Sequence, residues 1–91
     1  MSIGSYMYIH ICGDIAVSSR SIIGVFDLDK STISKTTREF LAAAQKRGSI
    51  VDLSTDIPKS FVVTEKNGVT TVYIAQVSAD TIWKRIKNAV P

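Results

Sequence analysis

The dipeptide Asn67-Gly68 restricts the possible fold of this chain more than any other feature. It separates two runs rich in β-branched and aromatic residues, FVVTE at residues 61–65 and VTTVYI at residues 69–74. Asparagine and glycine both accept the positive φ values that a two-residue hairpin turn requires, so the pair strongly indicates a β-hairpin. The sequence therefore predicts two neighbouring antiparallel strands in the C-terminal half of the chain.

Four further segments have the character of strands. Each is short, rich in β-branched residues and bounded by polar or turn-forming residues; they are residues 8–12, 15–18, 21–28 and 50–53. Gly13 and Asp14 indicate a turn between the first two segments, and Pro58 marks residues 54–59 as a loop. The chain is therefore predicted to contain six strands.

Two segments have helical periodicity instead. In the first, apolar or small side chains recur on one stripe, at Ile33, Thr37, Phe40, Leu41 and Ala44. We predict a helix from about residue 32 to 47, ended by Gly48 in a left-handed cap. Its N-cap is one of three polar residues, Ser31, Thr32 or Ser34. The second helix follows Ser78 and carries on one side Ile82, Trp83, Ile86 and Val90.

The predicted order of elements is βββαβββα, which describes a small single α+β domain. A chain of 9.9 kDa has only a thin core, yet 45% of its residues are hydrophobic and its mean hydropathy is +0.17. Two helices cover only part of six strands, so a sheet face or edge is left for another molecule. Part of the apolar surface should therefore lie against a partner, and a second copy of the chain is the simplest one.

The charge balance permits nucleic-acid binding without requiring it. There are 11 Lys and Arg residues against 8 Asp and Glu, which give a net charge of +3 and a pI of about 9.2. A basic protein of this kind can associate with nucleic acid or another anionic surface. In a homo-oligomer the bias grows, because every copy adds its charge to one shared field.

The single cysteine and the hydropathy pattern favour a cytoplasmic protein. Cys12 cannot form an internal disulfide, which suits a reducing compartment. No apolar run reaches the roughly 18–20 residues of a membrane span, and the first residues lack the basic and apolar regions of a signal peptide. Met7 opens the first strand-like segment, so residues 1–6 are expected to be a disordered extension or a cloning remnant, with residues 7–91 as the single domain.

The sequence contains no motif of an enzyme or of a cofactor site. A glycine-rich phosphate loop, paired zinc cysteines and a Ser/His/Asp constellation are all missing, so we expect no catalysis, cofactor or small-molecule substrate. His10 and Cys12 could begin a metal site, but only Asp14 is near as a further ligand. We favour a half-buried histidine and a buried cysteine in an ordinary strand. Asp27 and Asp29 are better explained by capping of the following helix than by paired-carboxylate chemistry.

Four strings of the sequence occur in a characteristic order. They are MYIH at residues 7–10, VSSRSIIGVFD at 17–27, PKSFVVT at 58–64 and SADTI at 78–82. Their order and spacing, over about residues 7 to 86, resemble the RemA/RemB family of bacterial extracellular matrix regulatory proteins. The first and third strings look closer to the RemB branch.

The resemblance implies a fold related to LytTR DNA-binding domains, assembled into closed homo-oligomeric rings. RemA members bind DNA at promoters of biofilm-matrix genes, along a basic surface of the ring, and RemB members are linked to the same regulatory programme. Such a surface neutralises phosphates more than it reads bases. The implied function is transcription regulation of biofilm-matrix genes through binding of double-stranded DNA.

The resemblance also implies which residues would contact DNA. An arginine after the second strand of RemA-type chains matches Arg20, whose alternatives are a solvated turn residue or a structural ion pair. A pair of adjacent arginines in those chains is replaced here by Ile57 and Pro58, followed by Lys59. Proline has no donor, so a single ammonium replaces two guanidinium forks. Arg20 and Lys59 are the candidate nucleic-acid-binding residues, with a solvated loop charge as the alternative for Lys59.

Oligomerisation would be part of the mechanism. One protomer with two phosphate contacts binds DNA too weakly at cellular salt, whereas linking many copies raises avidity by about 10²–10⁴. Candidate interface residues are Val25, Phe26 and Ile74. The alternative hypothesis is an oligomeric scaffold or protein-interaction module that lost DNA binding together with the arginine pair.

Overall fold

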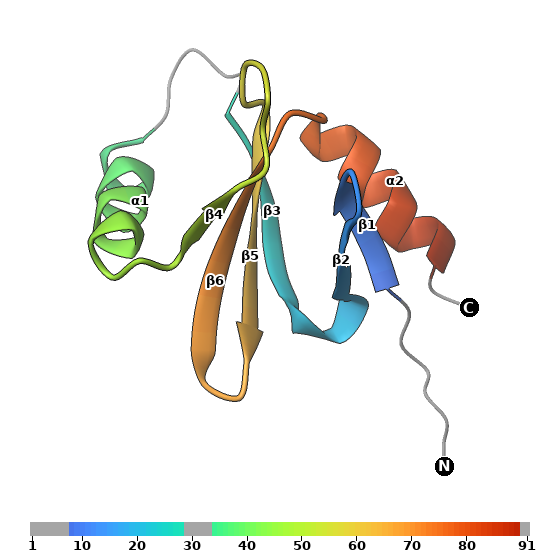
Figure 1. The fold of residues 1–91 in the computed structure, drawn as a ribbon, viewed down its shortest axis with the longest axis horizontal. Coiled ribbons are helices and arrows are strands. Elements are labelled where there is room, and N and C mark those ends of the chain that lie inside the picture. The colour runs from blue at the N-terminus through green and yellow to red at the C-terminus, as the bar shows by residue number, and fades with distance from the viewer. Residues whose placement is uncertain (1–7, 29–33, 90–91) are drawn as a thin grey trace.

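The computed structural model describes residues 8–28 and 34–89 of the chain (Figure 1). Its elements are β1 (Tyr8–Cys12), β2 (Ile15–Ser18), a 3₁₀ turn η1 (Ser19–Ser21), β3 (Ile22–Asp27), α1 (Lys35–Lys46), β4 (Ile50–Asp52), β5 (Ser60–Lys66), β6 (Val69–Ala75) and α2 (Ala79–Ala89). The predicted small α+β domain with two helices is confirmed. The expected extension at residues 1–6 lies outside the described residues, as do Ser31, Thr32, Ile33, Asp29 and Val90.

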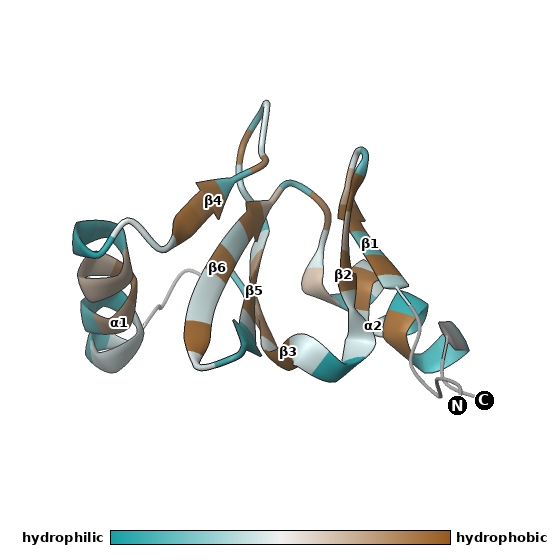
Figure 2. Cartoon of the chain, turned by 60° about the horizontal axis from the view of Figure 1, so that its bottom comes forward, coloured by the Kyte–Doolittle hydropathy of each residue, from teal (hydrophilic) through white to brown (hydrophobic). Residues whose placement is uncertain are grey.

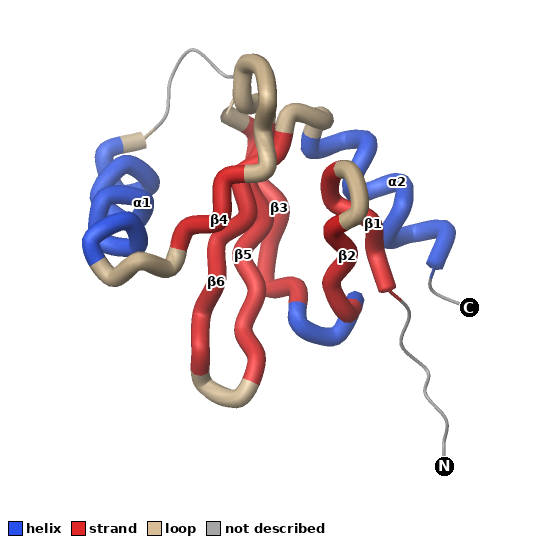
Figure 3. The backbone as a smooth tube through the Cα atoms, in the orientation of Figure 1, coloured by secondary structure: helices blue, strands red, loops and turns tan. Residues whose placement is uncertain are grey.

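The strands form two sheets (Figures 1 and 3). A four-stranded sheet has the order β3-β5-β6-β4, in which β4 is parallel to β6 and the other pairs are antiparallel. The β1–β2 hairpin forms a separate two-stranded sheet. Strands β3 and β4 are therefore the edges of the larger sheet, and the local β5–β6 hairpin is its centre.

The turn between β5 and β6 has the conformation that the sequence predicts. Asn67 has φ 54° and Gly68 has φ 80°, and Lys66 pairs with Val69 directly before and after the turn. These positive φ values are those of a type I′ turn, which Asn-Gly accepts with little strain. The hairpin prediction is confirmed.

The two faces of the four-stranded sheet pack against different partners. On one face, Val25 and Val62 lie in a core with residues of the β1–β2 hairpin and α2, which contributes the fully buried Ile82. On the other face, Phe61 and Val63 lie in a second core beneath α1 with a smaller set of partners, Ala44 and Val72 among them. Alternation along each strand divides the apolar residues between the faces, and Figure 2 shows the same alternation of polar and apolar residues.

Helix α1 begins three residues later than predicted. Ser34 has an extended conformation, and its Oγ accepts a hydrogen bond from the Thr37 backbone N at 3.1 Å, so it is the N-cap and Lys35 is the first helical residue. Gly48, at φ 72°, has the predicted left-handed conformation after the helix. Ala44 is buried, and Phe40 and Leu41 are half-buried against the sheet.

Helix α2 has the predicted cap and a more exposed tryptophan than predicted. The Ser78 Oγ accepts a hydrogen bond from the Thr81 backbone N at 3.1 Å. Ile82 is fully buried and Ile86 half-buried, but Trp83 is 45% exposed. Successive helical residues are rotated by about 100°, so Trp83 lies at the margin of the buried stripe.

The prediction for His10 and Cys12 is wrong in its burial. His10 is exposed, because Ile9 and Ile11 are the inward-facing residues of β1. A bulge between His10 and Cys12 interrupts the alternation and turns Cys12 towards the first core. The Cys12 thiol is half-buried and donates to the Leu53 carbonyl oxygen at 3.7 Å.

Candidate nucleic-acid interface

Arg20 lies on a short turn whose shape is fixed by two serines. The Ser18 Oγ accepts a hydrogen bond from the Arg20 backbone N at 3.3 Å, and the Ser21 hydroxyl donates to the Ser18 carbonyl oxygen at 2.7 Å. The Arg20 side chain is exposed. Because η1 leads directly into β3, the guanidinium is presented from a defined position at one end of the sheet.

Lys59 lies at the opposite end of the same strands. Its backbone N donates to the Ala75 carbonyl oxygen and its own carbonyl oxygen accepts from the Leu28 backbone N, both at 2.8 Å. The β3–β5 register runs from Ile22 opposite Thr64 to Asp27 opposite Ser60. Five strand steps span about 17 Å, so one protomer does not bring Arg20 and Lys59 together.

The loop that carries Lys59 is locally acidic. Asp52 and Asp56 contribute two negative charges against the single positive charge of Lys59, a net charge of −1 over residues 52–59. The Ser54 hydroxyl and backbone N donate to Asp52 Oδ1 at 2.6 and 2.9 Å. These hydrogen bonds, the hydroxyl first, hold the pKa of the Asp52 carboxyl below its ordinary value of 3.8. The Asp52 carboxyl is therefore ionised at neutral pH.

The positions of the missing arginine pair are apolar in the structure. Ile57 is 70% exposed, and Pro58 follows it before the backbone of Lys59 joins the sheet. Thr55 holds the loop to the start of the α2 connection, because its backbone N and hydroxyl both donate to Gln76 Oε1, at 2.7 and 3.0 Å. Within residues 52–59, Lys59 is the one cation that could meet a phosphate.

The three predicted interface residues have different environments. Val25 is only 8% exposed and belongs to the first core, and Ile74 is half-buried against the second core. Phe26 is 46% exposed and stacks on Phe61, with ring centroids 4.9 Å apart and planes at 20°. Of the three, Phe26 presents the most surface to another molecule.

Phe26 borders an apolar groove of about 320 Å³ between β3, β5 and α1. The groove is lined by Ile23, Phe26, Thr36, Thr37, Phe40, Phe61 and Val63. Gly24 makes room for the Phe26 ring, since a Cβ at this position would lie 2.7 Å from a ring carbon. An exposed apolar groove beside an edge strand is a surface suited to protein–protein contact.

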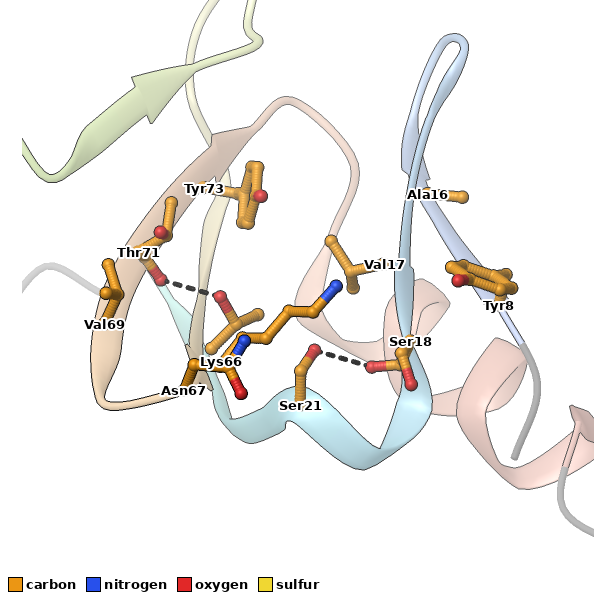
Figure 4. A pocket seen from close by; sticks show the side chains of 11 residues that line it. Tyr8, Ala16, Val17, Ser18, Ser21, Lys66, Asn67, Val69, Thr71 and Tyr73 are labelled. Atoms are coloured by element: carbon orange, nitrogen blue, oxygen red, sulfur yellow. Dashed lines mark hydrogen bonds between the residues drawn. The ribbon is translucent and has the colours of Figure 1, made fainter. Parts of the chain in front are cut away.

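A second, more polar groove of about 410 Å³ opens on the other face, between the β1–β2 hairpin and the sheet (Figure 4). The sequence does not predict this groove, because its lining residues come from both sheets and only their packing brings them together. The alternation of β5 offered a signal: Thr64 and Lys66 share a face with Val62, and both line this groove.

One basic residue of α2 has a structural role. Arg85 donates from Nη1 to the carbonyl oxygen of His10 at 2.9 Å and so joins α2 to β1. No group of three or more His, Cys, Asp or Glu residues in the described part of the chain could hold a metal ion. Neither of the two described helices has both the length and the apolar character needed to cross a lipid bilayer.

The fold and its surfaces define a small two-sheet α+β domain with an anchored basic turn and an exposed apolar groove. A family model described as "Extracellular matrix regulatory protein A-like" matches residues 8–86. The chain is also 38% identical over 79 residues to extracellular matrix regulatory protein B of Bacillus subtilis (strain 168), a match that spans 87% of this chain and 89% of that protein. The chain therefore belongs to the RemA/RemB family, on the RemB branch, a family named for regulation and not for an enzymatic reaction.

Proposed function

We propose that this protein is a cytoplasmic, DNA-binding transcriptional regulator of biofilm-matrix genes that acts as a homo-oligomeric ring. Membership of the extracellular matrix regulatory family supports the regulatory role. The observation that carries the DNA-binding part is the placement of Arg20 on a turn fixed by hydrogen bonds to Ser18. Because the backbone of the turn is already fixed, a phosphate contact made by the Arg20 side chain costs little further backbone entropy.

The ring belongs to the mechanism, because each protomer carries few cations. The net charge of +3 per chain is modest, and Arg20 and Lys59 lie at opposite ends of the sheet. In a ring, the same turn recurs around one surface, so that later phosphate contacts become intramolecular. A fold related to LytTR domains, which the family resemblance implies, forms part of this proposal.

A second copy is the partner that we assign to the edge formed by β3. Strand β3 is an edge of the four-stranded sheet, and its Ile23 and Phe26 side chains are 60% and 46% exposed. The adjoining groove adds the rings of Phe40 and Phe61. A repeating head-to-tail contact through such an edge closes into a ring when the rotation between copies permits it.

The alternative function is an oligomeric scaffold that binds protein partners and no DNA. The observation that favours it is the loop of residues 52–59, where Ile57 and Pro58 replace the arginine pair and the net charge is −1. A phosphate approaching this loop meets more negative than positive charge.

The two functions are separated by a variant that carries both Arg20→Ala and Lys59→Ala. Fluorescence anisotropy of a labelled duplex of mixed sequence is measured at low and near-physiological salt, with light scattering to confirm that the oligomer is intact. If the chain is a DNA-binding regulator, the variant binds more weakly and the dependence of affinity on salt becomes flatter. If the parent protein is folded and oligomeric but binds no duplex at either salt, the scaffold function stands.

A further inference from the structure

We infer that Lys66 and the polar groove beneath it form the phosphate-binding site through which each protomer holds the DNA backbone. The inference rests on the proposed function. It assigns the DNA contact to the end of the sheet that carries Arg20, and not to the end that carries Lys59. The groove lies between η1 and the β5–β6 hairpin on the face covered by the β1–β2 hairpin (Figure 4).

The chemistry of the groove suits a phosphate. None of the residues that line it carries a carboxylate, and Lys66 supplies a positive charge. Figure 4 shows the Lys66 side chain reaching across the groove towards the β1–β2 hairpin. Among the described residues, no hydrogen bond or ion pair engages its ammonium. An ammonium in this state keeps all three donors for an incoming anion.

Neutral donors surround the same space. The hydroxyl of Tyr73 and the amide of Asn67 line the groove without a hydrogen-bond partner among the described residues. Ser21 also lines it, at the foot of the turn that carries Arg20, but its hydroxyl already donates to the Ser18 carbonyl oxygen. Phosphate oxygens accept hydrogen bonds from side chains of these kinds as well as from lysine and arginine.

Arg20 and Lys66 lie at the same end of the strand pair. The turn η1, which carries Arg20, packs against β5. It leads into Ile22, which pairs with Thr64, two residues before Lys66 on β5. Glu65, between Thr64 and Lys66, projects to the opposite face because side chains alternate along a strand. The groove face of this end is therefore basic, whereas the loop of residues 52–59 at the other end has a net charge of −1.

The size of the groove agrees with a nucleotide unit as its occupant. About 410 Å³ lies within the range of small-ligand sites, and the groove is open on one side, as a continuous backbone requires. Tyr8, at the rim, also borders a neighbouring depression lined by Arg85 and Asn88. The backbone of a bound duplex can therefore continue from the groove along the junction of β1 and α2.

The test compares three variants of the full chain in duplex titrations by fluorescence anisotropy. Lys66→Ala removes the charge, Lys66→Arg keeps it, and Lys35→Ala is the charge-matched control on α1, beyond the opposite face of the sheet. We expect Lys66→Ala to weaken binding at least about tenfold and to lower the slope of log affinity against log salt by about one for each phosphate that is no longer neutralised. Lys66→Arg and Lys35→Ala should stay within about threefold of the parent protein.

Each possible result decides a different question. If the parent binds duplex and Lys66→Ala matches Lys35→Ala, the assignment to Lys66 is overturned while the proposed function stands. If the folded parent binds no duplex, the proposed function fails and the inference fails with it. Adenosine monophosphate serves as the probe for a free nucleotide: saturable binding below about 100 μM that Lys66→Ala abolishes, with duplex affinity unchanged, would overturn the assignment to DNA.

Discussion

The two faces of the four-stranded sheet carry grooves of similar size and different polarity. The groove beneath α1 is lined almost entirely by apolar side chains, including Phe26, Phe40 and Phe61. The groove on the opposite face is more polar: hydroxyl, amide and ammonium groups around Lys66 line it together with Ala16, Val17 and Val69. Because strand residues alternate between faces, one sheet carries an apolar groove on one side and a more polar groove on the other, and we propose a protein partner for the first and a phosphate for the second.

The helices differ in the same way. Helix α2 packs closely against β1 and β3, whereas α1 makes no comparably extensive approach to any strand within the described residues. In Figures 1 and 2, α1 lies at the left, beyond β4 and at the opposite end of the molecule from α2. Helix α2 therefore covers its face of the sheet more completely, whereas α1 leaves an apolar groove exposed beside it.

The largest effect is expected from a charge placed in the apolar groove. Phe26→Glu should convert the proposed oligomer into folded monomers, because a carboxylate cannot be buried against Phe40 and Phe61 without a partner. Duplex affinity should then fall by about 10²–10⁴, the gain expected from avidity. Light scattering reports the mass and anisotropy the affinity.

Ile57→Glu is the matched control, since Ile57 is even more exposed but lies on the loop away from this groove. It should leave both the mass and the affinity near those of the parent. A folded Phe26→Glu monomer that binds duplex as tightly as the parent contradicts the role of assembly, and so does a variant that remains oligomeric.

An effect of intermediate size is expected on the free energy of unfolding, and it should differ between the two cores. Ile82→Ala removes a fully buried side chain beneath α2 and should lower the free energy of unfolding by about 2–5 kcal/mol. Phe40→Ala removes a larger but half-buried side chain under α1 and should cost only about 1–2 kcal/mol. Urea unfolding of both variants in the Phe26→Glu background removes the contribution of association. Equal losses would mean that α1 is packed as firmly as α2.

The smallest effect concerns the acidic loop at the Lys59 end. Hydrogen bonds from Ser54 hold the pKa of Asp52 below 3.8, so their stabilising effect is present above the unfolded pKa and is lost as the pH falls through the folded one. Ser54→Ala removes the hydroxyl and leaves the backbone N–H, so the pKa of Asp52 should move part of the way back towards 3.8. Carbon-detected NMR titration of the carboxyl group measures this shift; an unchanged midpoint would show that the hydroxyl bond is absent in solution.

Local signals in the sequence predicted the helices, strands and turns. They did not predict which strands pair with one another. The Asn67-Gly68 turn and the caps at Ser78 and Gly48 depend on neighbouring residues, and the structure has all of them. The division into two sheets depends on which strands pair. Strand β4 pairs in parallel with β6, and the 3₁₀ turn η1 separates β2 from β3, which belong to different sheets. No local sequence pattern encodes either arrangement.

The candidate site was predictable only in part for a similar reason. The exposed turn position of Arg20 follows from the polar residues around it. The separation of Arg20 from Lys59, and the nearness of Lys66 to the β1–β2 hairpin, follow from the register of β3 on β5 and from packing between sheets. Val25 and Phe26 are adjacent in sequence, and only the orientation of β3 shows which of them faces the interior.

Gly24 has a consequence for how this protein can change over evolutionary time. The ring of Phe26 occupies the space that any side chain at position 24 would need. Selection for assembly through the groove would therefore act on a residue that has no side chain with which to touch a partner. A single methyl group at Gly24 would displace the Phe26 ring and so reshape the apolar groove without adding or removing a charge.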